Sequence, residues 1–302
     1  MAARDGRVWS YEYLRVAAAF SVVLYHQKGP CYWLGVAGLS LFLLISFSLL
    51  AGSKTDAPLG AFAASRARRV LLPWVFWSAV YLAMNLLRQW RHGTPFFEPW
   101  MVPAGFSLHL WYLPFLFTAS VVVYAVRQRC PAVDRPAGVG VCAALGLAVF
   151  VANAVLLPTV IPVHQWLTAA PSTLFGQALG RIGLGRAARP RWAATAALLA
   201  ATAAVCAARF FIPGRQALDA VMLLLGLALF SAAGAVRLPD TAAVRLLAPL
   251  TMGIYVVHPL VMDMFVRAAG ASNTLLRVSL VFAASAALVY CMRKAPVLHR
   301  FV

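Results

Sequence analysis

Long apolar runs, separated by short polar stretches, continue from one end of the chain to the other. Each run is close to the roughly 20 residues that a helix needs to cross the hydrocarbon core of a bilayer. A chain in lipid must satisfy its backbone hydrogen bonds internally, so runs of this length predict membrane-spanning α-helices. The pattern predicts an all-α polytopic membrane protein with about ten transmembrane helices, at residues 9–27, 34–52, 70–88, 108–127, 138–157, 164–182, 192–209, 216–236, 246–266 and 275–293.

The composition supports a membrane protein over a nucleic-acid-binding one. The 302 residues are 63% hydrophobic and only 11% charged, whereas about a quarter of a soluble domain is charged. A formal net charge of +18 would also suit a protein that binds nucleic acid. Here, however, the charges form short clusters between apolar runs, as the positive-inside rule produces. We therefore expect the lipid bilayer as a partner and no nucleic acid.

The distribution of Lys and Arg predicts the orientation. Of the 26 basic residues, 18 lie on the side of the predicted helices that holds both termini, 7 lie on the other side, and Arg15 lies within the first run. Cytoplasmic loops carry the excess of basic residues, so the N- and C-termini are predicted to be cytoplasmic. The loops are short and no shift in composition marks a second unit, which predicts a single transmembrane domain over residues 1–302.

The first run carries ionisable residues at both of its ends. Glu12 and Arg15 stand at its start and His26 at its end. Arg15 and His26 are about three turns apart, so they share one helix face and lie roughly 16 Å apart along the axis. Glu12 is close enough to Arg15 to form an ion pair. Ionisable groups inside a membrane are costly and usually functional; the alternative is that Arg15 snorkels to one interface while His26 lies in the other.

Other polar residues interrupt the apolar pattern near each end of the bundle. Arg66 and Arg69 precede the third run, share a face if that stretch is helical, and suit a phosphate clamp. The alternative is an ordinary basic anchor at the cytoplasmic surface. Ser46 lies in the second run, where its hydroxyl can also bond to the preceding turn. His109 and Trp111 open the fourth run on the same side as His26, where an aromatic belt is the alternative for Trp111.

A Tyr–His pair stands within the ninth run. Tyr255 and His258 are three residues apart, so they lie on one helical face. A single buried histidine is more often structural than functional, but such a pair inside a membrane helix is rarer.

The order and spacing of these residues resemble those of the acyltransferase-3 family. Its members are ten-helix integral membrane proteins that transfer acyl groups, commonly acetyl, to surface glycans and related acceptors. The resemblance covers nearly the whole chain and rests on Arg15, His26, Arg66, Arg69, Pro73, His109, Trp111, Tyr255 and His258. The chain departs from the family pattern at Tyr13, Val16 and Phe47, where the family often has glycines.

The resemblance implies an O-acyltransferase of the bacterial plasma membrane. It would move an acyl group from cytoplasmic acyl-CoA, commonly acetyl-CoA, to a hydroxyl of a surface glycan or glycolipid at the opposite face. It implies that the catalytic residues are Glu12, Arg15, His26, Tyr255 and His258. It implies that the residues that bind the substrates are Ser46, Arg66, Arg69, His109 and Trp111. His26 would act as general base or as transient acyl carrier, while Tyr255 and His258 orient the acceptor or stabilise the oxyanion.

No resident cofactor or metal is expected, since acyl-CoA is a substrate. A zinc ion bound by His26, His109 and His258 is a less favoured alternative. The competing function is a transporter or flippase for a lipid-linked or glycan substrate, which would also use intramembrane Arg, Glu and His. A phosphate clamp at the cytoplasmic side has no obvious role in a flippase, which favours the enzyme.

Overall fold

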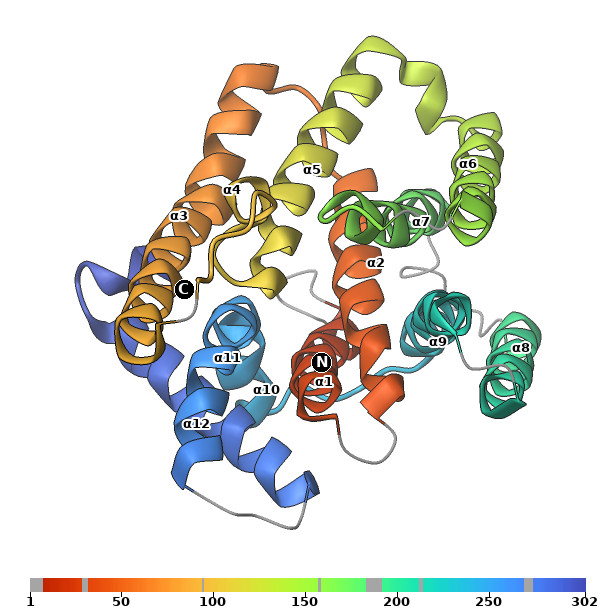
Figure 1. Ribbon diagram of the computed structural model, residues 1–302. Helices are drawn as coiled ribbons and strands as arrows, with labels where there is room; N and C mark the ends of the chain where they lie inside the picture. The colour runs from red at the N-terminus through yellow and green to blue at the C-terminus, as the bar shows by residue number, and fades with distance from the viewer. Residues whose placement is uncertain are drawn as a thin grey trace.

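The computed structural model describes residues 8–28, 32–93, 95–156, 159–182, 192–211, 214–268 and 274–302. Over these residues the chain is all-α, with α-helices, short 3-10 helices and no strand (Figure 1). The α-helices are α1 (Trp9–Gln27), α2 (Ala37–Ala51), α3 (Leu59–His92), α4 (Met101–Ala104), α5 (Tyr112–Arg129), α6 (Pro136–Leu156), α7 (Val163–Arg181), α8 (Trp192–Phe211), α9 (Arg215–Ala235), α10 (Ala242–Leu247), α11 (Thr251–Ala268) and α12 (Thr274–Lys294). The 3-10 helices are η1 (Tyr32–Val36), η2 (Leu108–Trp111), η3 (Pro131–Asp134), η4 (Ala248–Leu250) and η5 (Leu298–Phe301).

The predicted all-α membrane architecture is confirmed. A helix lies at each of the ten predicted apolar runs. Within the described ranges, seven helical segments are long and apolar enough to cross a membrane: Tyr32–Ala51, Leu59–His92, Leu108–Arg129, Pro136–Leu156, Arg215–Ala235, Ala242–Phe265 and Thr274–Lys294. The total of ten spans and the cytoplasmic placement of the termini stay predictions.

The third helix begins earlier than the apolar pattern predicts. The predicted run starts at residue 70, whereas α3 starts at Leu59, so Arg66 and Arg69 lie within a helix rather than a loop. The added turns are rich in Ala and Arg, which are strong helix formers, and the three arginines lower the hydropathy of this stretch. Pro73 lies inside α3 and is buried there, as is tolerated in membrane helices whose neighbours satisfy the freed backbone groups.

Helices α1 and α2 lie at the centre of the molecule in Figure 1. Helix α1 packs against α2, α11 and α12, and α2 packs against α7 and α9, while α3 packs against α5. Small residues line the contacts of α2: Ser40 hydrogen-bonds to Ser172 of α7 over 2.8 Å, and Gly226 of α9 lies against Ser40. Such residues let helix backbones approach closely in lipid, where packing rather than hydrophobic burial drives association.

A polar network fixes the start of α3. Arg127 of α5 is buried and donates hydrogen bonds to the Leu50 carbonyl and, over 3.0 Å, to the Ser53 carbonyl, both at the end of α2. Its Nε also pairs with Asp134 at 3.0 Å. The hydroxyl of Tyr124 donates to the Ala57 carbonyl over 2.8 Å. The segment from α2 to α3 is therefore held against α5, which sets the position of the first turns of α3.

Candidate active site

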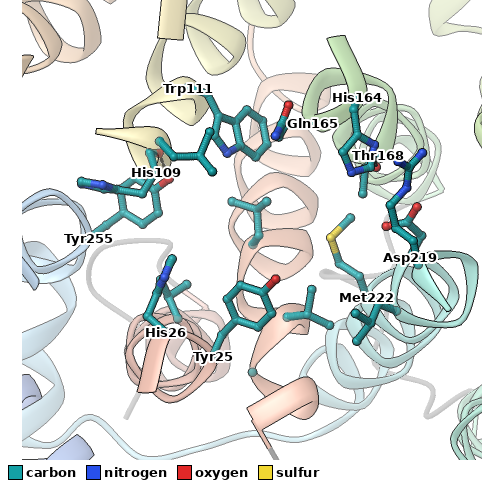
Figure 2. Close-up of a pocket in the computed structure, with 17 residues that line it drawn as sticks. Tyr25, His26, His109, Trp111, His164, Gln165, Thr168, Asp219, Met222 and Tyr255 are labelled. Carbon is teal, nitrogen blue, oxygen red and sulfur yellow. Dashed lines mark hydrogen bonds between the residues drawn. The ribbon is translucent and has the colours of Figure 1, made fainter. Parts of the chain in front are cut away.

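Three histidines from distant parts of the chain meet in the centre of the bundle. His26 comes from the end of α1, His109 from η2 and His258 from α11. The His258 ring lies 5.0 Å from that of His26 and 5.5 Å from that of His109, measured between ring centroids. Tyr255 joins them, with its ring 5.8 Å from His109. Figure 2 shows His26, His109 and Tyr255 on one side of a common cavity.

The sequence His258-Pro259 fixes the proton position on His258. Proline has no N–H, so Pro259 cannot donate to the carbonyl of Tyr255 four residues earlier in α11. The Nδ1 of His258 takes that place and hydrogen-bonds to the Tyr255 carbonyl over 2.8 Å. Because a carbonyl only accepts, Nδ1 carries the proton and Nε2 is bare. His258 is fully buried, and its Nε2 has no hydrogen-bond partner.

His109 is engaged through both ring nitrogens. Its Nε2 donates to the Val256 carbonyl over 3.3 Å, and its Nδ1 accepts from the Ser107 hydroxyl over 3.0 Å. The hydroxyl of Tyr255 donates in turn to the carbonyl of His109. These bonds tie η2 to α11, and they leave His109 no free lone pair for a metal. The zinc alternative thus loses one of its three ligands, and across the described ranges no group of three His, Cys, Asp or Glu is placed to hold a metal ion.

His26 and His109 open onto a cavity of about 330 Å³, the histidine cavity. Of the predicted site residues, His26, His109, Trp111 and Tyr255 line it. Trp111 is buried, so it is a cavity residue rather than part of an aromatic belt facing lipid. The other residues that line the histidine cavity are Val22, Tyr25, Gly35, Val36, Leu39, Leu108, His164, Gln165, Thr168, Arg215, Leu218, Asp219 and Met222.

Two further cavities, the arginine cavities, lie toward the other end of α1. Their volumes are about 570 Å³ and 380 Å³, and Arg15, Ser46 and Arg69 line both of them. Arg66 lines the smaller one, together with Leu49, Leu50, Ser53, Phe62 and Ser65. The larger one is also lined by Phe42, Tyr112, Ala248, Pro249, Thr251, Met252, Tyr255 and Arg293. The predicted shared face of Arg66 and Arg69 is confirmed.

Tyr255 lies between the two kinds of cavity. It lines the histidine cavity and also the larger arginine cavity, although only 4% of its surface is exposed. Molecules entering from the two ends of the bundle would therefore meet at this side chain. Arg15 and His26, three turns apart on α1, face the two cavities from opposite sides of this meeting point, and the predicted ion pair of Arg15 with Glu12 is present at 3.2 Å.

Four arginines line the cavities toward one end of α1, whereas three histidines line the cavity toward its other end. Residues 8–294 match the acyltransferase domain of the acyltransferase-3 family. The chain belongs to this family. It is therefore a membrane acyltransferase, and its apolar helices make it a multi-pass membrane protein. Comparison of this acyltransferase with curated proteins and with solved structures gave no match.

The structure of the acyltransferase brings most predicted residues to the cavities. There are two exceptions. Glu12 reaches the arginine cavities only through its ion pair with Arg15. His258 is fully buried and lies behind the histidine cavity, in contact with the rings of His26 and His109. Sequence reasoning missed Arg293, which lines the larger arginine cavity, because it was read only as a cytoplasmic charge. It also missed Arg215 and Asp219 in the histidine cavity. Their spacing of four residues at the start of the apolar run 216–236 was the signal that could have found them.

Proposed function

We propose that this acyltransferase moves an acyl group, most simply acetyl, from cytoplasmic acyl-CoA to a hydroxyl of a surface glycan or glycolipid. The transfer takes place within a bacterial plasma membrane, with both termini of the enzyme in the cytoplasm. The observation that carries the proposal is the pair of cavities that meet at Tyr255, one lined by arginines and one by histidines. The arginine-lined cavity suits an anionic acyl donor, and the histidine-lined cavity suits an acceptor with a neutral hydroxyl group.

The arginine cavities suit the phosphates of the donor. Guanidinium groups bind phosphate oxygens through paired, charge-assisted hydrogen bonds. Arg66 lies over the ring of Phe62, with 5.6 Å between its guanidinium carbon and the ring centroid. Phe62 stacks on Tyr124 with centroids 3.9 Å apart, so Arg66 is positioned by the packing of α3 on α5. Arg293 lines the larger arginine cavity and Arg66 the smaller one, while Arg15 and Arg69 line both. From this group of arginines the pantetheine arm would extend toward Tyr255, which lines the larger cavity.

His26 is the proposed general base. It lines the histidine cavity and is half-buried, so an acceptor hydroxyl can reach it. One imidazole nitrogen of His26 takes the proton as the hydroxyl oxygen forms a bond to the thioester carbonyl carbon. When the tetrahedral intermediate collapses, the carbon–sulfur bond breaks, and the proton passes from His26 to the CoA sulfur. The products are an O-acyl ester and free CoA, and His26 is regenerated without an acyl-imidazole.

His258 is proposed to position His26. The bond from its Nδ1 to the Tyr255 carbonyl leaves Nε2 able only to accept. The His26 ring lies beside it, at 5.0 Å between centroids. A hydrogen bond from one His26 nitrogen to His258 Nε2 would leave the other His26 nitrogen bare toward the acceptor. This is the orienting role that a third group has in other nucleophile–base–orienter sets.

The developing oxyanion needs a donor that is free in the resting enzyme. The proton of the Tyr255 hydroxyl is engaged with the His109 carbonyl, so Tyr255 would have to exchange that bond in order to donate. Trp111 lines the same cavity, and its indole N–H can only donate. Preorganised donors of this kind are often the largest single catalytic contribution. We therefore propose Trp111 as an oxyanion donor, with Tyr255 as the side chain beside which acyl donor and acceptor meet.

Mass spectrometry of surface glycans and lipids, with and without the gene, tests this function. The expected result is an acceptor that loses the mass of one acyl group when the gene is deleted and regains it when the gene is restored. Restoration with the His26→Gln variant should not bring the mass back. Unchanged acylation in the deletion strain, together with a lipid-linked glycan that no longer crosses the membrane, would favour the transporter instead.

A further inference from the structure

The wall of the histidine cavity that faces the histidines is polar. It is built from α7 and α9 and presents His164, Gln165, Thr168, Arg215 and Asp219. Asn153 of α6 does not line the cavity but hydrogen-bonds to this wall. Figure 2 shows His164, Thr168 and Asp219 across the cavity from His26, His109 and Tyr255. None of these side chains takes part in the chemistry proposed above.

Hydrogen bonds join α6 to the two helices of this wall. The amide nitrogen of Asn153 donates to the Thr168 hydroxyl over 3.2 Å and to a carboxylate oxygen of Asp219 over 3.1 Å. The Thr168 hydroxyl also contacts Nδ1 of His164 at 3.4 Å. Asn153 is 2% exposed. Side chains held in this way are set in position before any ligand arrives, which lowers the entropic cost of binding one.

Several polar atoms of the wall nevertheless have no partner. Buried and without a hydrogen bond are Nε and Nη2 of Arg215 and Oε1 of Gln165. Each such atom costs free energy in the empty protein, and buried polar groups are rarely left this way without a reason. The set offers two donors and one acceptor on residues that line one cavity, and the carboxylate of Asp219 adds further acceptor oxygens. A ligand that satisfies all of them must itself both accept and donate.

The charges of the wall identify the kind of ligand. Arg215 and Asp219 are four residues apart on one face of α9, so the pair has opposite charges that sum to zero. A free anion would meet the carboxylate of Asp219 as well as the guanidinium. Hydroxyl groups accept from Arg215 and donate to Asp219 and Gln165 without such repulsion. The rings of Trp111 and Tyr25 add flat apolar surface to the same cavity.

We propose that this wall is a subsite for an uncharged polyhydroxylated ring, that is, a neutral sugar of the acceptor. The inference rests on the proposed function in one respect: a sugar bound here presents another of its hydroxyls to His26 across the cavity. Arg215 and Asp219 then determine which acceptor is used, while His26 and His258 carry out and orient the proton transfer. The acyl donor does not contact this wall.

Steady-state kinetics in nanodiscs test the subsite. The acceptor is a glycan extract of the source cells, separated by anion exchange into neutral and acidic fractions, and the donor is labelled acetyl-CoA. For Arg215→Gln and Asp219→Asn we expect the half-saturating concentration of the neutral fraction to rise about tenfold or more, since each variant loses at least one charge-assisted bond. Half-saturation by acetyl-CoA should stay unchanged, which also shows that the variants fold. Arg91→Gln, at an exposed position of α3 outside this cavity, is the matched control.

A binding measurement separates this inference from the proposed function. Tritium-labelled neutral glycan should bind the wild-type enzyme and bind both variants about tenfold more weakly. If the wild type binds this glycan but releases no CoA with any fraction, the proposed function fails and the subsite stands. If the glycan binds wild type and variants equally, or binds none of them, the subsite is wrong. If only the acidic glycan fraction saturates the wild-type enzyme, and Arg215→Gln is no longer saturated by it, the neutral-sugar assignment is wrong.

Discussion

Replacing Arg66 and Arg69 one at a time tests how the enzyme holds its donor. Both line the smaller arginine cavity, and Arg69 also lines the larger one. Arg→Ala removes the charge and the guanidinium fork together. A hydrogen bond to a charged group contributes about 1.5 to 3 kcal/mol, so each Ala variant should weaken acetyl-CoA binding by roughly 10- to 150-fold. Because Arg69 faces both volumes, its loss should be the larger.

Lysine variants separate the effect of the paired hydrogen bonds of a guanidinium group from the effect of its charge. Lys keeps a positive charge but has no bidentate geometry, so Arg66→Lys and Arg69→Lys should each weaken acetyl-CoA binding about tenfold, less than Ala does. Both variants should still be expressed and inserted, because the positive charge that sets topology is kept. Arg68→Lys is the matched control, since Arg68 lies between them, is exposed and lines neither arginine cavity.

Equilibrium binding to enzyme in nanodiscs measures these effects, with acetyl-pantetheine as a second ligand that has no phosphates. The variants should bind acetyl-pantetheine as the wild type does, since the arginines act on the phosphates. Raising the salt concentration should weaken acetyl-CoA binding to the wild type more than to the Ala variants. Equal acetyl-CoA affinity in the wild type, Arg66→Lys and Arg69→Lys would refute the clamp and return the pair to the role of a basic anchor.

Two further predictions concern topology and packing. The bias of Lys and Arg places the C-terminus in the cytoplasm and the 89–107 loop outside. Alkaline phosphatase, a reporter active only outside the cytoplasm, should therefore be inactive when fused after Val302 and active when fused after Pro99. The reverse pattern would overturn the orientation. Gly226→Ala should lower the free energy of unfolding in detergent by about 1–3 kcal/mol, because the new Cβ would lie 2.7 Å from that of Ser40. Gly140→Ala, with nothing within 4 Å, should be neutral or stabilising, and an equal loss in both variants would contradict the packing argument.

Sequence reasoning located the helices because each needs one long apolar run, whatever it packs against. It failed where a helix departs from that rule. The first turns of α3 are helical but too polar to be recognised by hydropathy, which is why Arg66 and Arg69 were expected in a loop. The bond from His258 to the Tyr255 carbonyl was open to prediction, since Pro259 frees that carbonyl by a local rule.

The candidate site was predictable as separate motifs but not as an assembled cavity. Periodicity placed Arg15 and His26 on one face of α1, and both do line cavities. It does not tell which helices are neighbours. The contact of His109 with the Val256 carbonyl joins residues 147 positions apart, and Arg215 and Asp219 become meaningful only once α9 is placed opposite α1 and α11. Tertiary packing decides these features, so no local pattern contains them.

The turnover of His26→Gln is the most direct measurement of the central claim. Gln keeps a polar side chain of similar reach but cannot take up a proton near neutral pH. With purified enzyme in nanodiscs, labelled acetyl-CoA and an acceptor extract, release of free CoA should fall by roughly 10² to 10⁴. Acetyl-CoA affinity should stay close to that of the wild type, because His26 lines the histidine cavity and not the arginine cavities. Wild-type turnover in His26→Gln would contradict the account, since it would show that His26 is not the base.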